Sequence, residues 1–210
     1  MAARYTGRTN ALDMSMPHVD PLPRESLSEF EPRFQAVERA IGFVPNSYFT
    51  LGHRPEILRT FAPFAATVPG RGATAPVLKQ LIALVASNAA GCRYCQAHTS
   101  SGAAVRGGDP AKIEAAFDFE TSPLFTSAER SALRIARDAA LQPNATTPAH
   151  FAQLREYFTA PEVVEIVSVI GLFGFLNRWN DTIATQLEDE PVAFASHHLA
   201  TSGWTSGKHQ

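Results

Sequence analysis

The sequence repeats one pattern along its length: short groups of apolar residues at helical spacing, bounded by proline or glycine. Phe30, Phe34, Val37 and Ile41 recur three or four positions apart, and Gly42 follows them as a helix stop. Alternating strand patterns bounded by hairpin turns are absent from the sequence. We therefore predict an all-α protein, a bundle of about eight to ten helices.

Start signals indicate where the other helices begin. Proline suits a first helical turn because the N–H it lacks needs no partner there, and a Thr-x-x-Glu capping box satisfies two further amides. The helix from Pro161 is apolar on nearly every side as far as Leu176, so we expect it at the centre of the core. The other predicted starts are Pro45, Pro55, Pro76, Cys92, Pro110 and Thr126.

The ends of the chain lack this periodicity. Residues 1–24 contain several prolines among scattered polar residues, which predicts an extended N-terminal arm. Residues 191–210 begin with Pro191 and contain Gly203, which predicts an irregular C-terminal tail. Residues 25–190, with no linker between them, are predicted to form a single helical domain.

Composition excludes several classes of partner. Hydrophobic residues make up 45% and charged residues 18% of the chain, a globular composition. The net charge is −2 without a long basic run, so neither nucleic acid nor an anionic membrane is an expected partner. The N-terminus lacks the apolar core of a secretory signal, and the most apolar stretch, Ile166–Leu176, is about half of a bilayer crossing. We therefore expect a cytoplasmic protein that binds small molecules or other proteins.

The chain contains only two cysteines, and they stand three positions apart in the run GCRYCQAH. Residues three apart share a helix face, so Cys92 can meet Cys95, and Cys95 can meet His98. A helix start supplies the Cα separation of roughly 4.4–6.8 Å that a disulfide needs. Helix N-termini stabilise thiolates, and imidazoles move protons. This spacing indicates a redox dithiol with a proton-transfer histidine. The order in which the two thiols act stays open, although the helix dipole favours Cys92.

A longer stretch around this motif, LKQLIALVASNAAGCRYCQAHTSSGAA, resembles the core of the alkylhydroperoxidase D (AhpD)-like family, within the carboxymuconolactone decarboxylase superfamily. Its peroxidase-related branch is also similar in GFVPNSYFTLGHRPEILRTF and PEVVEIVSVIGLFGFLNRWND, so the resemblance covers most of residues 42–190. The resemblance implies an AhpD-like helical bundle that forms a homo-oligomer (dimer, trimer or hexamer). It also implies reduction of hydroperoxides with electrons from a thiol or dithiol reductant protein, without a bound cofactor.

The resemblance further implies residue roles. The second cysteine of the family motif attacks peroxide and the first resolves the product, which makes Cys95 peroxidatic and Cys92 resolving. Gln80 stands where the family has a proton-relay glutamate, and an amide cannot take up a proton at neutral pH. The family histidine follows the second cysteine by four residues, whereas His98 follows it by three. This shift of one residue turns the side chain by about 100° around the helix. We therefore expect His98, rather than Gln80, to transfer the proton.

The resemblance also places the polar end of the long helix near the site. Solvent exposure of this helix end explains its polarity equally well. The residues concerned are Asn177, Arg178, Asn180 and Asp181.

Other interpretations of the motif remain open. A zinc site needs four ligands, and beyond the cysteines only His53, His150 or the pair His197-His198 could contribute, so we expect no metal. A decarboxylase or lactone-processing enzyme acting on a small ring acid is the second enzymatic hypothesis. A redox-sensing helical module whose disulfide switches an interface is the non-enzymatic one.

Overall fold

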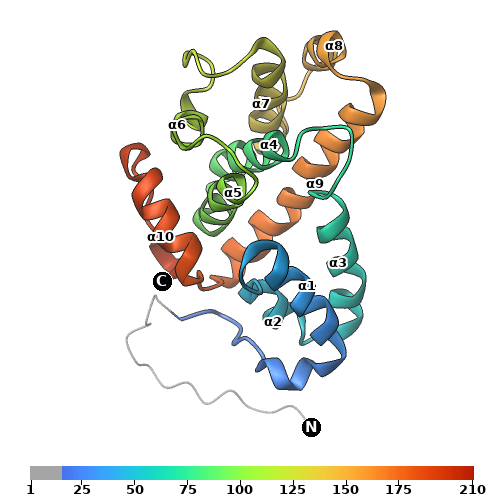
Figure 1. Cartoon of the computed structure of the whole chain (residues 1–210), viewed down its shortest axis with the longest axis vertical. Coiled ribbons are helices and arrows are strands. Elements are labelled where there is room, and N and C mark those ends of the chain that lie inside the picture. The colour runs from blue at the N-terminus through green and yellow to red at the C-terminus, as the bar shows by residue number, and fades with distance from the viewer. Residues whose placement is uncertain (1–15) are drawn as a thin grey trace.

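The computed structural model describes residues 16–210, and within that range the chain forms ten α-helices and four 3-10 segments but no strand (Figure 1). The all-α prediction is confirmed. The α-helices are α1 Glu31–Ile41, α2 Asn46–Leu51, α3 Pro55–Thr67, α4 Pro76–Ala89, α5 Arg93–Val105, α6 Pro110–Glu114, α7 Ser127–Ala140, α8 Pro148–Tyr157, α9 Ala160–Ile183 and α10 Asp189–His198. The 3-10 segments are η1 Arg24–Phe30, η2 Ala115–Asp118, η3 Ala200–Ser202 and η4 Gly207–His209.

The predicted helix ends are where the local signals place them. Helix α1 ends at Gly42, whose φ of 94° is in the left-handed region that glycine tolerates best. Thr126 and Glu129 form the expected capping box at α7. The start of α8 carries the same device with histidine in place of glutamate, because His150 Nδ1 accepts the Thr147 N–H at 3.0 Å. The Thr-x-x-Glu pattern does not detect this variant of the box.

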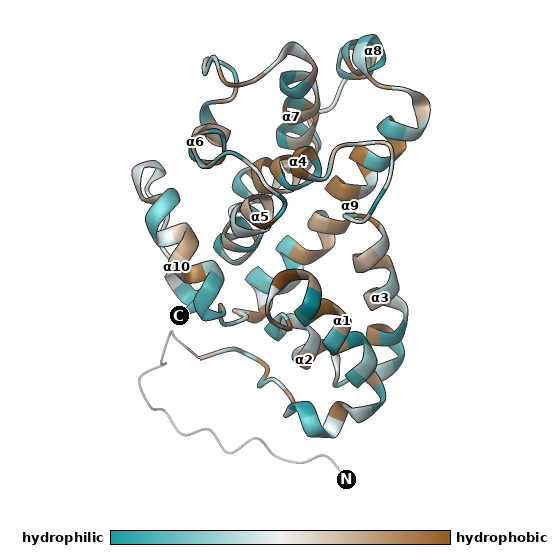
Figure 2. Cartoon of the chain, viewed as in Figure 1, coloured by the Kyte–Doolittle hydropathy of each residue, from teal (hydrophilic) through white to brown (hydrophobic). Residues whose placement is uncertain are grey.

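Helix α4 occupies the centre of the core, where it packs against α5, α7 and α9. Nearly all of its side chains after the first turn are buried, and the apolar segments of α4 and α9 meet in the middle of the molecule (Figure 2). Helix α9 is the longest element, but it is not buried all round: Val164 is 64% exposed and Val167 43% exposed. The apolar sequence of α9 alone could not distinguish a helix face that is buried within the chain from one that is exposed on its surface.

Helix α9 also meets the length and composition expected of a membrane span, with a mean hydropathy of 1.5 over its most apolar window. In the bundle, however, α9 contacts α4, α5, α7 and α8, and its inward face contributes Ile166, Val169 and Leu172 to the core. These contacts place the inward face of α9 in the core of the bundle.

The C-terminal segment differs from its prediction. Residues 189–198 form α10 rather than an irregular tail, and α10 packs on α5. Pro191 lies in the first turn of α10, where its missing N–H costs nothing, so it does not prevent the helix. Beyond α10, Trp204 is buried and donates from Nε1 to the Arg93 carbonyl at 3.2 Å. His209 is buried as well, and its Nδ1 donates to the Thr185 carbonyl at 2.8 Å.

The predicted N-terminal arm lies partly outside the described residues, since residues 1–15 are not among them. In the described part, 16–24, residues 16–23 contain no helix and follow the surface of the bundle, and Arg24 begins η1. The His18 amide donates to the Ile183 carbonyl at 2.8 Å, and the Leu22 amide donates to the Phe49 carbonyl at 3.2 Å. This part of the arm therefore joins the end of α9 to α2.

Candidate active site

The two cysteines lie at the start of α5, directly after the turn that leaves α4. Gly91 makes this turn with a φ of 77°, and Cys92 is the N-cap of α5. The Cys95 amide donates to Cys92 Sγ at 3.4 Å, so the sulfur of Cys92 satisfies one of the open amides of the helix. Both cysteines are buried and both are free thiols. The i, i+3 spacing thus places the two thiols within the first turn, as predicted.

A cavity of about 350 Å³ lies beside Cys95. Its wall is largely apolar, and α1, α3 and α9 contribute Val37, Phe61 and Leu172 to it opposite α5. The polar groups of the wall that bear on the chemistry are Gln80, Tyr94, Cys95, His98 and Asn180. Cys92 is fully buried and is not part of this wall. The structure therefore distinguishes the two thiols: one faces the cavity and the other lies behind it.

The Cys95 thiol is protonated at neutral pH. Burial raises the pKa of Cys95 well above its ordinary value, and the neighbouring Cys92 raises it further. The Asn180 side chain acts in the opposite direction, because its Nδ2 donates to Cys95 Sγ at 3.6 Å. The helix N-terminus does not outweigh this burial, so any nucleophilic use of Cys95 requires a base close by.

The structure supplies a carboxylate that the sequence did not indicate. Glu188, the N-cap residue of α10, is 10% exposed, and its Oε2 lies 2.6 Å from His98 Nε2. Its Oε1 accepts the Tyr94 hydroxyl at 2.9 Å and the Asn46 amide at 2.5 Å. The Tyr94 ring stacks on the His98 ring with centroids 4.2 Å apart. His98 is thereby held between an aromatic ring and a buried carboxylate.

The charge state of Glu188 suits this role. Burial alone would raise its pKa, but the charge and hydrogen bond of His98, together with the Asn46 amide, outweigh burial and leave the pKa of Glu188 lowered. An ionised Glu188 accepts the Nε2 proton of His98. In the neutral form of His98, this contact leaves Nδ1 as the ring nitrogen without a proton. Glu188 and His98 are thus a hydrogen-bonded carboxylate–imidazole pair beside the cavity, a type of pair that can transfer protons.

Glu188 could not be identified from local patterns. Glu188 and Asp189 together are typical of an acidic helix start, a common capping arrangement that does not indicate a catalytic role. The predicted Gln80 does line the cavity and is buried. Of the four polar residues near the end of α9, only Asn180 belongs to the wall of this cavity.

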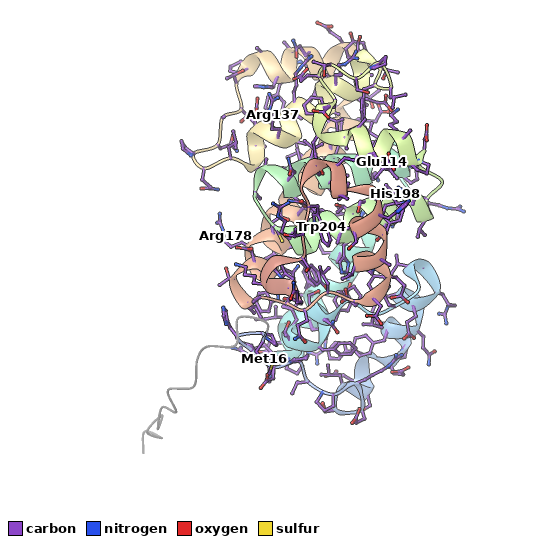
Figure 3. The ribbon with its side chains drawn as sticks, turned by 90° about the vertical axis from the view of Figure 1, so that its left-hand side faces the viewer. Met16, Glu114, Arg137, Arg178, His198 and Trp204 are labelled. Atoms are coloured by element: carbon purple, nitrogen blue, oxygen red, sulfur yellow. The ribbon has the colours of Figure 1, made fainter. Side chains whose placement is uncertain are left out.

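The histidines weighed as zinc ligands have other partners. His53 Nε2 lies 2.9 Å from the Asp20 carbonyl, and His150 Nε2 lies 2.9 Å from Asp138. His198 pairs with Glu114 at 2.7 Å on the outside of α10, where Figure 3 shows the two side chains together. Among residues 16–210, no group of three or more His, Cys, Asp or Glu side chains is placed to hold a metal ion.

The sequence is similar to a known protein family and to a curated relative. The profile of the carboxymuconolactone decarboxylase family matches residues 55–138, from the start of α3 to near the end of α7. The Escherichia coli K12 protein YnjA is 32% identical over 108 residues, which are 51% of this chain and 59% of YnjA. The chain thus matches somewhat more than half the length of that relative.

Solved structures extend the likeness to nearly the whole chain. The debrominase Bmp8 is 34% identical with a TM-score of 0.80, and the match covers 90% of this chain and 97% of Bmp8. That Bmp8 structure is a cysteine-to-alanine variant in complex with 2,3,4-tribromopyrrole. A peroxidase-related AhpD core protein from Ralstonia eutropha JMP134 is 24% identical with a TM-score of 0.73, covering 84% of this chain and 94% of that one. At this identity the second likeness is one of fold.

Proposed function

Since the chain belongs to the carboxymuconolactone decarboxylase family, we propose that it is a thiol-dependent peroxidase that reduces hydroperoxides through Cys95 and Cys92. The placement of the two thiols is the observation that carries this proposal: Cys95 faces the cavity and Cys92 lies directly behind it. The geometry agrees with the peroxidatic and resolving roles that the family motif implies. The proposal requires no bound cofactor, because both electrons come from thiols.

In the first step, His98 Nδ1 takes the proton of the Cys95 thiol, and Glu188 stabilises the imidazolium that forms. The Cys95 thiolate attacks the terminal oxygen of the hydroperoxide and the O–O bond breaks. Cys95 becomes a sulfenic acid, and the departing alkoxide receives the proton held by His98. A hydroperoxide and a thiol are thus converted to an alcohol and a sulfenic acid.

In the second step, the Cys92 sulfur attacks the Cys95 sulfenic acid. A disulfide forms, and the hydroxyl group leaves as water with the Cys92 proton. An external thiol or dithiol protein then reduces the disulfide and restores both thiols. This cycle fits the reducing cytoplasm in which we expect the protein to act.

A second candidate reaction uses the same residues on a halogenated aromatic ring. The near full-length likeness to the debrominase Bmp8 favours it. In this reaction the Cys95 thiolate attacks the halogen, and the ring carbon takes the proton from His98. Cys92 then displaces halide from Cys95 as the disulfide forms. Two thiols again supply two electrons, and the ring exchanges halogen for hydrogen.

One assay separates the candidate functions. Wild-type protein is given a dithiol reductant with cumene hydroperoxide in one arm and a brominated pyrrole in the other, and peroxide loss and bromide release are measured. Steady peroxide loss supports the peroxidase, and steady bromide release alone supports the dehalogenase. A single stoichiometric oxidation without turnover supports the redox sensor. In a third arm with a small ring acid, decarboxylation without thiol consumption would support the remaining enzymatic hypothesis.

Oxidation should join the two thiols within one chain. The Cys92 sulfur lies in the same helical turn as Cys95, within 3.4 Å of its amide, so no large rearrangement is needed for closure. After mild peroxide treatment, we expect the count of free thiols to fall from two to zero while the mass on a non-reducing gel stays that of one chain. Two persistent free thiols, or a covalent dimer, would contradict this expectation.

The exposed apolar face of α9 should be covered by another copy of the chain. Val164 and Val167 share this face, and an apolar stripe of this kind on a core helix is typical of a subunit contact. We expect a light-scattering mass that is a multiple of 22.7 kDa. Val164→Arg should lower this mass, while Leu124→Arg, at an exposed apolar position before α7, should leave it unchanged. A monomeric wild type would disprove the oligomer.

A further inference from the structure

The cavity beside Cys95 carries positive charge but no negative charge. Arg33 from α1 and Arg106 at the end of α5 contribute to its wall, whereas no aspartate or glutamate of residues 16–210 does. Glu188, the nearest carboxylate described above, lies behind His98 rather than in the wall. The rest of the lining is largely apolar and aromatic. A ligand that fills this space meets a thiol, an apolar wall and two guanidinium groups.

Arg106 lies on the same face of α5 as the Cys95 thiol. Cys95, Gly102 and Arg106 are separated by seven and four residues, which keeps them on one helix face. Arg106 Nη1 donates to the Gly102 carbonyl at 2.9 Å, so the guanidinium turns back along the helix toward Cys95. At 1.5 Å per residue, Gly102 is on the order of 10 Å along the axis from Cys95. This distance suits a ligand about the size of one substituted aromatic ring.

The guanidinium of Arg106 is a cation at the edge of the cavity. It is half-buried, and among residues 16–210 it takes part in none of the salt bridges. Burial lowers the pKa of Arg106, as expected for a cation that is withdrawn from water without a counter-charge. An ionised acid bound there would supply the missing charge and accept two parallel N–H bonds.

Gln80 adds a further polar group at this end of the cavity. Its Oε1 would lie 2.7 Å, and Arg106 Nη1 3.4 Å, from a Cβ atom placed on Gly102. Glycine at this position therefore lets both side chains converge over α5. In place of the relay glutamate of the family, a neutral amide leaves the positive field of Arg106 undiminished. The replacement of the family glutamate by Gln80 therefore removes a group that carries protons, and it also removes a negative charge that would repel an acidic ligand.

We propose that this site prefers substrates with a carboxylate on an apolar, aromatic-sized body, and that Arg106 and Gln80 bind the carboxylate while the reacting atom lies at Cys95. Arg33 adds positive charge to the same cavity and attracts the anion toward it. This inference rests on the proposed function for the nature of the reacting group. The preference for an acid rests on the charges of the cavity alone. Arg106 is a specificity residue in this scheme and takes no part in proton transfer.

Turnover is measured with two hydroperoxides of equal shape, the para-carboxylate and the para-carboxamide of cumene hydroperoxide. For the wild type, kcat/KM should be roughly 10-fold higher for the carboxylate, the effect of one charge-assisted hydrogen-bonded contact. Arg106→Gln should bring this ratio close to one, whatever it does to the overall rate. Arg155→Gln, on α8 and outside the cavity, should keep the wild-type ratio.

Binding provides a readout that is independent of turnover. Calorimetry on the wild type compares para-isopropylbenzoate with para-isopropylbenzamide, neither of which can be reduced. We expect the benzoate to bind roughly 10-fold more tightly, and Arg106→Gln to abolish the difference. Equal affinities in the wild type would overturn the inference without any variant. Tight benzoate binding without peroxide turnover would instead refute the proposed function and leave the inference standing.

Discussion

Replacing Cys95 by serine is expected to lower peroxide turnover by about 10³-fold or more, because Cys95 is the thiol that faces the cavity. A serine hydroxyl at this position cannot reduce an O–O bond. Cys92→Ser should behave differently: the attack on peroxide still occurs, but no neighbouring thiol resolves the sulfenic acid. This variant should consume one equivalent of peroxide rapidly and then stall.

The measurement is peroxide loss with a dithiol reductant, followed from the first turnover onward. A sulfenic-acid trap such as dimedone should label Cys92→Ser after oxidation and leave Cys95→Ser unlabelled. Rapid consumption of one equivalent of peroxide by Cys95→Ser, together with loss of all activity in Cys92→Ser, would reverse the two roles. The reactive sulfur would then be the more N-terminal one that the helix dipole favours.

Removing the imidazole of His98 should reduce the rate at neutral pH by roughly 10²-fold or more. Burial keeps Cys95 as a thiol, so the proton must be accepted during the attack, and in the proposed mechanism His98, which lines the same cavity and is paired with Glu188, accepts it. The loss in His98→Ala should shrink as the pH rises. Because the pKa of Cys95 is raised, its thiolate forms without help from a base only at alkaline pH. The variant therefore depends less on a base as the pH rises.

Two further variants test whether the relay is the pair seen in the structure. Glu188→Gln keeps the shape of the side chain and its contacts with Asn46 and Tyr94 but removes the charge that stabilises an imidazolium. The peroxide turnover of Glu188→Gln should fall nearly as far as that of His98→Ala, whereas the turnover of Gln80→Ala should fall much less. Comparable losses in His98→Ala and Gln80→Ala would show that neither residue is the relay. Full activity in Glu188→Gln would limit Glu188 to a structural contact.

The helices and the dithiol could be predicted because their determinants are local. Gly42 stops α1 through its own φ angle, and the Thr126–Glu129 box is closed by residues three positions apart. The same holds for Cys92 and Cys95, since one helical turn brings their sulfurs and amides together. Pattern reasoning failed where local signals were ambiguous, as at Pro191, which reads as a breaker but occupies a first helical turn.

The sequence by itself determined the all-α fold, the position of the two thiols and the histidine beside them, because helical periodicity and capping act within a few residues. Only the tertiary structure decided which thiol faces a cavity, since this depends on α1, α3 and α9 enclosing one side of α5. It also brought Glu188 to His98 across 90 positions of the chain. Burial then raised the pKa of Cys95. Desolvation and charge pairing depend on everything packed around a group, and a linear pattern does not contain that information.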